Sequence, residues 1–589
     1  MPKVLLVYPE NPPTFWSANE TLKLAGRKSA FPPLGLLTVA GLLPRDYDLK
    51  LVDLNVEPLR DRDVLWADVI LTSSMIIHWP SLEEIIARAN ALGTPIVNGG
   101  PLPTQYHAEI AGNAVFYLGE AENGFVDVVE DAIRDGAHGG RRVVDRRGAW
   151  KSLEETPVPR WDLIELDDYG TMMIQVTRGC PESCTFCNIP ALYGKTTRLR
   201  AETRTTRELD VLYDAGWRGL VMVVDDNFVG NRTAIRTILE NEVIPWQQER
   251  HYPFQLFTQA SIRLTEDPAL MEAMREAGFA TIFVGIESPS ADSLKFMAAQ
   301  KNLQGDVSLV EKVRTLQSYG FQVQAGFIVG FDTDPADIAD VTIDFIQEAA
   351  IPVAMVGILG VLPDTPDYTR YKRLGRLIEG VKYSGDSGLF SRQLSFVPNI
   401  DPEELFARHR RIVETVNSPD RFFERCLALL SHQKRAPRAG LKIAPWHIAT
   451  LFRSLWHQGI LSPYRRDYWR YLAAILRRHP RRFVSAFTMG VLAHHPITAT
   501  QQALRAASFR TYCEEALQRF ERLVATRPAD AAAIRRHAAD LLDNAHRRYA
   551  ELKRDFRNQV KETLASFRTG VMRIAEMAEN ASGRVPEQS

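Results

Sequence analysis

The sequence predicts an α/β protein with two successive strand-and-helix domains followed by a helical C-terminal region. Short apolar runs alternate with helical stretches over residues 1–140 and again over residues 171–395. Residues 396–500 are expected to form a helical extension, and residues 501–589 carry apolar residues at the spacing of amphipathic helices. At 589 residues the chain is too long for one hydrophobic core. We therefore expect several domains, with residues 141–170 as the linker between the first two.

The composition is that of an ordinary water-soluble protein. Hydrophobic residues make up 45% and charged residues 24% of the chain, and the formal net charge is −1, so the overall charge indicates no nucleic-acid partner. The first residues do not resemble a signal peptide, and no apolar run reaches the ~18 residues of a membrane-spanning helix. Five cysteines, three of them close together, do not suggest a disulfide framework. We therefore expect a cytoplasmic protein.

The first domain is predicted to be a doubly wound, flavodoxin-like (Rossmann-like) sheet. Its expected strands are Lys3–Tyr8, Leu49–Val52, Asp68–Thr72, Pro95–Asn98 and Ala114–Leu118. Near-continuous apolar runs of this kind are typical of parallel strands that are buried on both faces. Such sheets bind ligands beyond the carboxyl ends of their strands, and glycines there let a large flat ligand approach closely. The candidate binding residues at these ends are Ser73, Ser74, Gly99, Gly100, Gly119 and Glu120.

The second domain repeats strand and helix six times, which predicts a partial (β/α)6 barrel of the TIM type. The expected strands are Met172–Val176, Leu220–Val224, Phe254–Thr258, Thr281–Ile286, Gln322–Val329 and Val353–Val361. Functional residues of barrels lie at the carboxyl ends of the strands. Polar candidates at these ends are Asp225, Asp226, Asn227, Glu287 and Gln324. Each could simply cap the following helix, but together, at one end of one barrel, they predict a site.

Three of the five cysteines lie within eight residues, directly after the first strand of the second domain. Cys180, Cys184 and Cys187 have the spacing C-x3-C-x2-C. Thiolates suit zinc or an iron–sulfur cluster, but zinc sites usually include a fourth Cys or His, and none follows at zinc-ribbon spacing. Three thiolates on a four-iron cluster would leave one iron for a ligand that is not protein. A structural zinc site or a redox-active cysteine trio is the alternative.

The cysteine motif resembles the signature of the radical S-adenosylmethionine (SAM) superfamily. The resemblance implies that the three cysteines hold a [4Fe-4S] cluster whose fourth iron is chelated by the amino and carboxylate groups of SAM. It also implies roles for several other residues. Phe186 would pack on the adenine and Asp225–Asn227 would hold the methionine amino group of SAM. Glu287 would lie near the ribose and the carboxylate, and Gly326–Gly330 would line the adenine side.

Paired with this motif, the first domain resembles the cobalamin-binding domain that precedes many radical SAM domains. The resemblance rests on the strand end at Tyr8-Pro9, on the long Pro-rich loop that follows it, and on the later Gly-Gly and Gly-Glu-Ala-Glu turns. The D-x-H-x-x-G motif that supplies an axial histidine in other cobalamin proteins is absent, and no histidine precedes His78. We therefore assign no axial cobalt ligand. A second departure is Asp364, which replaces the glycine of the P-G-T-P turn that follows the sixth strand in the family.

Together the resemblances imply a cobalamin-dependent radical SAM methyltransferase. In that chemistry a 5′-deoxyadenosyl radical takes a hydrogen atom from an unactivated carbon, and the substrate radical then takes a methyl group from methylcobalamin. Residues 391–401 and the helix Pro402–Val416 resemble the branch that includes hopanoid methylases and the enzymes of bacteriochlorophyll biosynthesis that methylate side chains. This implies a small hydrophobic, polycyclic substrate and an electron donor of the ferredoxin or flavodoxin type. Cyclisation, oxygen insertion or C–C coupling remains an alternative outcome, and a non-catalytic cobalamin sensor is a third option.

A basic and aromatic tract runs from Lys434 to Thr500. It holds twelve Lys or Arg residues against a single acid, Asp467, with tryptophans and tyrosines between them. Such a tract can bind nucleic acid, can lie on an anionic membrane surface, or can form a solvated helical cap whose aromatic residues pack on the barrel. A hydrophobic substrate held in a membrane would favour peripheral membrane contact.

Overall fold

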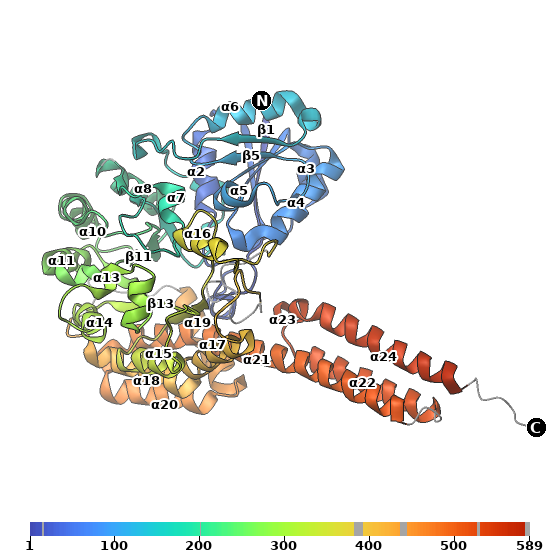
Figure 1. The fold of residues 1–589 in the computed structure, drawn as a ribbon. Helices are drawn as coiled ribbons and strands as arrows, with labels where there is room; N and C mark the ends of the chain where they lie inside the picture. Colours follow the sequence, from blue (N-terminus) through green and yellow to red (C-terminus); the bar gives the residue numbers. More distant parts are fainter. Residues whose placement is uncertain (15–16, 201, 382–392, 436–444, 527–530, 583–589) are drawn as a thin grey trace, which may run out of the picture. The chain divides into compact units, whose positions relative to one another are not determined.

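The computed structural model describes residues 1–14, 17–200, 202–381, 393–435, 445–526 and 531–582 (Figure 1). The chain divides by its contacts into two units, Met1–His495 and Pro496–Ser589. The first unit contains two parallel sheets with helices packed on them, and the described part of the second unit is helical (Figure 1).

The first sheet has the doubly wound topology that the sequence predicts. Its strands are β1 (Lys3–Tyr8), β2 (Asp48–Asp53), β3 (Val69–Ser73), β4 (Ile96–Gly99), β5 (Val115–Leu118) and β6 (Arg142–Asp145). They are all parallel, in the order β2-β1-β3-β4-β5-β6. The edge strand β6 lies in the stretch that we expected to be a linker. Its residues are alternately exposed and half-buried, so it lacks the apolar run by which the buried strands are detected.

Helices cover both faces of the first sheet. On β1, Leu5 and Val7 pack in a core with Trp79 of α4, whereas Val4 packs on the opposite face with Phe125 of α6. This alternation is the reason that the strand reads as continuously apolar. The helices of this domain are α1 (Asn19–Ala25), α2 (Leu34–Leu42), α3 (Asp61–Trp66), α4 (Trp79–Leu92), α5 (Pro101–Tyr106) and α6 (Phe125–Asp135).

The second sheet has six parallel strands in chain order, the topology of an open partial barrel. The strands are β7 (Met172–Ile174), β10 (Leu220–Val223), β11 (Gln255–Ala260), β12 (Phe279–Glu287), β13 (Gln322–Val329) and β14 (Ala354–Ile358). The main helices between them are α8 (Glu202–Asp214), α9 (Arg232–Ile238), α10 (Ile244–Glu249), α11 (Pro268–Glu276), α14 (Leu309–Ser318) and α15 (Ile338–Glu348). Alternate residues of every strand, such as Val221 and Val323, pack into one large core.

Helices follow the second sheet in the described chain. In the first unit these are α16 (Pro366–Arg373), α17 (Pro402–Val416), α18 (Pro419–His432), α19 (Pro445–Trp456), the π-helical turn η8 (His457–Leu461) and α20 (Arg465–Arg478). The long helix α21 (Phe483–Thr526) contains Pro496, at which the second unit begins. In that unit α22 (Ala531–Ala550) packs along α24 (Lys561–Ser582) (Figure 1). Among the described helices, none combines the length and the hydropathy needed to cross a bilayer.

Several predicted segments lie partly outside the described residues, among them residues 527–530 and 583–589 of the C-terminal region. Residues 391 and 392 of the extension and residues 436–444 of the basic tract, which include Arg438 and Lys442, are not described. The described helix α17 has the bounds that the sequence predicts.

Candidate functional site

Two short strands close the base of the loop that carries the three cysteines. β8 (Thr177–Arg178) pairs antiparallel with β9 (Arg198–Leu199). Between them, Gly179 has a φ of 90°, and a Cβ atom at this position would collide with backbone carbonyl oxygens across the loop. The amide of Cys180 donates a hydrogen bond to the Gly194 carbonyl over 3.3 Å. Backbone contacts therefore fix the position from which the cysteine loop starts.

The three thiols lie in surroundings that suit a bound cluster. Cys184 is buried, and Cys180 and Cys187 are half-buried. Burial raises the pKa of Cys184 to about 11 and that of Cys187 to about 12, so without metal these thiols are neutral. Across the described residues, no three His, Cys, Asp or Glu side chains are grouped to ligate a single metal ion. A four-iron cluster makes a different demand, because each thiolate binds its own iron, and the three-thiol loop fits that demand.

A buried ion pair lies beside the thiols at the end of β12. The ammonium of Lys301 is 2.9 Å from Glu287 Oε1, and both side chains are almost fully buried. Burial alone would lower the pKa of Lys301, but the attraction of Glu287 and of the thiols Cys184 and Cys180 raises it above its usual range. This cation could offset the negative charge of a thiolate-bound cluster. Lys301 lies 14 residues after Glu287, and no local motif in the sequence marks it as part of the site.

Glu287 adopts a backbone conformation that is unusual for its residue type. Its φ is 63°, in the left-handed region that non-glycine residues rarely enter. The side-chain amide of Asn302 donates hydrogen bonds to the carbonyls of Gly285, over 3.2 Å, and of Ile286, over 2.6 Å. The register of β12 and β13 also shifts between Gly285 and Glu287. Such strain persists only where surrounding contacts hold it, and it is concentrated at functional sites.

The polar residues after β10 hold the ends of neighbouring strands. Asp225 is fully buried, and its carboxylate accepts hydrogen bonds from the Val176 amide and the Thr177 hydroxyl, both over 2.8 Å. Asp226 accepts from the Gly179 amide over 3.1 Å. Asn227 accepts from the Ser261 amide over 3.1 Å. Asp225 and Asp226 therefore position the start of the cysteine loop, and Asn227 positions the end of β11. Contact of these side chains with SAM stays a prediction.

Glu120, a predicted cofactor contact, forms ion pairs with the base of the cysteine loop. Its carboxylate is 2.5 Å from Arg198 and 3.6 Å from Arg178. Arg178 also lies 2.9 Å from Glu122, whose carboxylate accepts a hydrogen bond from the Thr156 hydroxyl. All four charged side chains are 15% exposed or less. This ion-pair network joins the carboxyl edge of the first sheet to β8 and β9.

Other predicted residues lie at the same edge of the first sheet. The Ser74 amide donates to the Gly99 carbonyl over 3.1 Å, while the buried Ser74 hydroxyl has no hydrogen-bond partner among the described residues. Gly100 and Gly119 have φ values of 95° and 112°. A Cβ atom on Gly100 would lie 2.9 Å from the Ser74 backbone, so this glycine is required for packing. An unsatisfied hydroxyl at this edge fits a ligand with polar groups on its rim, as the amide side chains of a corrin provide.

His78 is not placed to act as an axial ligand. Its Nε2 is 2.7 Å from Asn11 Oδ1, its Nδ1 accepts a hydrogen bond from the Met75 amide over 3.2 Å, and its ring packs edge-on against Tyr8. Burial lowers the pKa of His78 to about 4. The ring is therefore neutral and both of its nitrogens are occupied.

The edge of the first sheet and the mouth of the barrel are linked by direct contacts. The side chain of Gln105 on α5 accepts a hydrogen bond from Asn188 over 2.8 Å and donates one to the Pro363 carbonyl over 3.0 Å. Asn188 directly follows Cys187, and Pro363 precedes Asp364. Asp364 has a φ of 62°, which explains why this turn usually contains glycine. Asp is among the residues that tolerate this conformation best, so the turn is preserved.

The inner face of the barrel has a floor of apolar and polar side chains and a glycine-rich upper part. In-register residues of neighbouring strands share a face, and those that alternate with the core residues form layers. One layer contains Met173, Met222, Phe257, Thr281 and Gln322, and the next contains Gln259, Phe283 and Gln324. Above them Gly285 is in register with Gly326, and Ile328 with Gly357. A Cβ atom on Gly357 would meet no atom within 4 Å, so open space lies beside this glycine.

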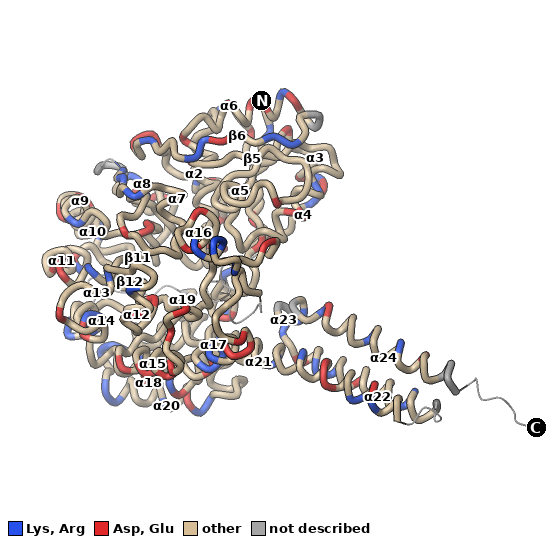
Figure 2. The backbone as a smooth tube through the Cα atoms, viewed as in Figure 1, with Lys and Arg blue, Asp and Glu red and all other residues tan. Residues whose placement is uncertain are grey.

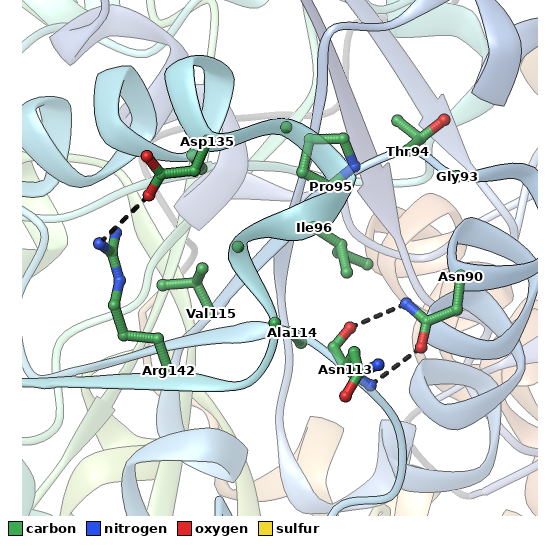
Figure 3. A pocket seen from close by; sticks show the side chains of 14 residues that line it. Asn90, Gly93, Thr94, Pro95, Ile96, Asn113, Ala114, Val115, Asp135 and Arg142 are labelled. Atoms are coloured by element: carbon green, nitrogen blue, oxygen red, sulfur yellow. Dashed lines mark hydrogen bonds and ion pairs between the residues drawn. The ribbon is translucent and has the colours of Figure 1, made fainter.

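The predicted residue Phe186 directly precedes Cys187 in the cysteine loop. Its ring is partly buried against a core cluster that contains Cys184 and Phe331. Gln324 is half-buried on the inner face. A small cavity elsewhere, lined by Asn90, Asn113 and Arg142 (Figure 3), lies at the amino ends of β4 and β5. Because that end of the sheet is opposite the candidate edge, this cavity is not part of the site.

Comparison with known families agrees with this architecture. A family model for the B12 binding domain matches residues 22–129, and one for the radical SAM superfamily matches residues 174–346. A domain of unknown function, DUF4070, matches residues 365–508. The predicted order of domains, a cobalamin-binding domain followed by a radical SAM barrel and helices, is therefore confirmed.

Several curated proteins are similar along most of the chain. An uncharacterized methyltransferase of Synechocystis sp. is 35% identical, covering 83% of this chain and 90% of the relative. The hopanoid C-2 methylase of Rhodopseudomonas palustris is 30% identical, covering 85% and 94%. The bacteriochlorophyllide d C-12(1)-methyltransferase of Chlorobaculum tepidum is 25% identical, covering 59% and 74%. Among solved structures, the cobalamin-dependent SAM radical enzyme OxsB with aqua-cobalamin bound has a TM-score of 0.52 at 14% identity, covering 85% and 81%, a likeness of fold.

Proposed function

Since the chain belongs to the family of cobalamin-dependent radical SAM methyltransferases, we propose that it methylates an unactivated carbon of a hopanoid-type lipid. A [4Fe-4S] cluster, SAM and cobalamin are the cofactors of this chemistry; when bound they supply the electron, the hydrogen-abstracting radical and the methyl group. The observation that carries the substrate proposal is the 30% identity to a hopanoid C-2 methylase over 94% of that enzyme's length. The bacteriochlorophyllide relative matches less of its own length, 74%.

In this proposal the residues of the cysteine loop and of the barrel mouth have distinct roles. Cys180, Cys184 and Cys187 hold the cluster, and Lys301 offsets its negative charge. Phe186 packs on the adenine of SAM, and Glu287 orients the methionine end of SAM. An electron donor of the ferredoxin or flavodoxin type reduces the cluster, because the chain has no second set of closely spaced cysteines.

The remaining predicted contacts belong to the cobalamin edge and to the barrel interior. The corrin lies against an edge at which backbone atoms are accessible, with the unsatisfied Ser74 hydroxyl as a hydrogen-bond donor. This edge is formed by Ser73, Ser74, Gly99, Gly100 and Gly119. Within the barrel, the Met and Phe side chains of the two layers offer contacts to an apolar substrate, and Gln259 and Gln324 lie in the same layer as polar partners. The open space beside Gly357 is where we place part of the substrate.

An anaerobic methyl-transfer assay tests the proposal. The full chain is reconstituted with iron, sulfide and hydroxocobalamin, and is given a strong reductant and SAM with a labelled methyl group. A detergent-solubilised hopanoid and a bacteriochlorophyllide are offered in separate reactions. Formation of 5′-deoxyadenosine and S-adenosylhomocysteine, with label in the hopanoid, is the expected result.

Two other outcomes would change either the substrate or the reaction type. Label in the bacteriochlorophyllide alone overturns the hopanoid substrate but keeps the methyltransferase. A product with an unchanged number of methyl groups, formed with 5′-deoxyadenosine, indicates cyclisation, oxygen insertion or C–C coupling.

A further inference from the structure

Exposed apolar side chains are concentrated on α19 and η8. Ile448, Phe452 and Trp456 are 51%, 66% and 56% exposed. Their spacing of four residues places them along one side of α19. Ile460 and Leu461, at 52% and 58% exposed, continue this row onto η8. Single exposed apolar residues are common, but a contiguous apolar patch on a protein surface usually marks a binding site.

The apolar row continues onto α20. The indole of Trp469 donates a hydrogen bond to the Gly459 carbonyl over 2.9 Å, and its ring lies over that glycine. Trp469, Ala473 and Leu476 are all exposed, and their spacing of four and three residues aligns them on one side of α20. We call the surface formed by these three residues and by Ile448, Phe452, Trp456, Ile460 and Leu461 the apolar face.

Arginines border the apolar face on α20. Arg466, Arg470 and Arg477 are exposed and lie on the stripe next to Trp469 and Leu476, at the same helical spacing. Figure 2 shows the basic residues along this helix. Asp467, the one acid that the sequence places in the tract, lies 3.4 Å from Arg470. With three arginines against this one acid, the border of the apolar face carries a net positive charge.

The inward side of the same helices forms an ordinary packed core. Tyr464, Tyr468 and Tyr471 are at most 3% exposed, and the Tyr468 hydroxyl is 2.7 Å from the Ser454 hydroxyl. These tyrosines therefore belong to a helical cap in which their rings pack against Phe423 of α18, whereas the sequence placed such aromatic residues on the barrel. Arg482 also points inward and donates hydrogen bonds to the carbonyls of Leu430 and Gln433, so it is not part of the border.

We propose that the apolar face binds an anionic lipid bilayer, with its tryptophans and Phe452 in the interfacial region and its arginines on the headgroups. Tryptophan and arginine in adjacent stripes are typical of helices that lie in a membrane interface. A positive border favours anionic lipid over a second copy of this chain, which would bring the same positive border into contact with itself. The apolar face is inferred from exposed side chains and their charges, independently of the substrate. The role that we give the apolar face, which is access to a lipid substrate dissolved in the membrane, rests on the proposed function.

Co-sedimentation of the full chain with vesicles tests this inference. Vesicles of phosphatidylcholine alone are compared with vesicles of equal parts phosphatidylcholine and phosphatidylglycerol, and only the second are expected to bind tightly. The double variant Phe452→Ser/Trp456→Ser should lose roughly tenfold or more in affinity, because two large apolar side chains no longer enter the interface. The variant Arg466→Gln/Arg470→Gln/Arg477→Gln should lose roughly a hundredfold, at about fivefold per basic residue.

A matched control is available elsewhere on the surface. Leu65 and Leu374 are 63% and 55% exposed, so Leu65→Ser/Leu374→Ser removes similar apolar exposure and should bind as the native chain does. Absence of binding to the anionic vesicles, or unchanged binding of the Phe452→Ser/Trp456→Ser variant, overturns the proposal. A native dimer in solution that this variant converts to a monomer also overturns it, in favour of a second copy. Methyl transfer to detergent-solubilised hopanoid is scored separately, so the proposed function can fail without the membrane surface failing.

Discussion

Replacement of Arg178 by glutamine tests whether the ion-pair network holds the cysteine loop in place. Arg178 ends β8, two residues before Cys180, and contacts Glu122 at 2.9 Å and Glu120 at 3.6 Å. The two carboxylates would respond differently to its loss. Glu120 keeps Arg198 at 2.5 Å, whereas Glu122 loses its arginine and keeps the Thr156 hydroxyl.

The size of the effect follows from burial. Burial alone would raise the pKa of Glu122, but Arg178 outweighs it and holds that pKa below its usual value. Removal of one partner of a buried pair costs about 3–5 kcal/mol, because the other charge is left uncompensated. Glu122→Gln should cost less, about 1–3 kcal/mol, since Arg178 keeps Glu120 and a hydrogen bond to Gln175. The double variant removes both charges and should recover part of the loss caused by Arg178→Gln.

Hydrogen–deuterium exchange of the peptides that cover β8 and β9 is the appropriate measurement, because a chain of two units does not unfold in one step. A local loss of about 3 kcal/mol accelerates exchange more than a hundredfold. The matched control is Arg147→Gln, which breaks an exposed pair with Asp145 and should change little. Unchanged exchange in Arg178→Gln, or a double variant as unstable as the sum of the single variants, would refute the reasoning.

Three further predictions concern the cluster, the loop and the barrel interior. Cys184→Ala should abolish the cluster and 5′-deoxyadenosine formation while cobalamin binding persists. The control is Cys426→Ala at another buried cysteine, which should keep the cluster, 5′-deoxyadenosine formation and cobalamin binding. SAM cleavage that is retained in Cys184→Ala contradicts the assignment. Burial raises the pKa of Asp225 from 3.8 to about 7, so the native state binds this proton more tightly than the unfolded chain does. Loop protection from exchange should therefore fall between pH about 4 and about 7, and Asp225→Asn should flatten that fall; an identical pH profile argues against the buried carboxyl. Gly357→Leu places a side chain in open space and should lower substrate methylation more than substrate-independent SAM cleavage; equal losses in both would show that the space serves SAM instead.

The sequence determined the parts of the fold whose signals are local. Buried parallel strands such as β1 and β13 are continuous or alternating apolar runs, and their bounds in the structure match the predicted ones. The cysteine spacing marked the loop for the same reason, since three ligands of one centre lie within eight residues. The strand β6 was not predicted because it lies at the edge of the sheet and pairs only with β5. Its side chains are exposed or half-buried, so its sequence has no apolar run.

Only the tertiary structure decided how distant charges pair. Lys301 of α13 (Gln300–Leu303) contacts Glu287 at the end of β12. Glu120 contacts Arg198 of β9, 78 residues away. Both pairs form because the fold brings elements that are distant in the sequence together. The spacing of these residues in the sequence does not predict either ion pair.

The same holds for the tract after Lys434, where the sequence showed only that basic and aromatic residues alternate. Which aromatic residues are covered, such as Tyr468, and which are exposed, such as Phe452, depends on the side of each helix that its neighbours bury. Burial is a property of the packed molecule, so the apolar face exists only once the helices have packed together.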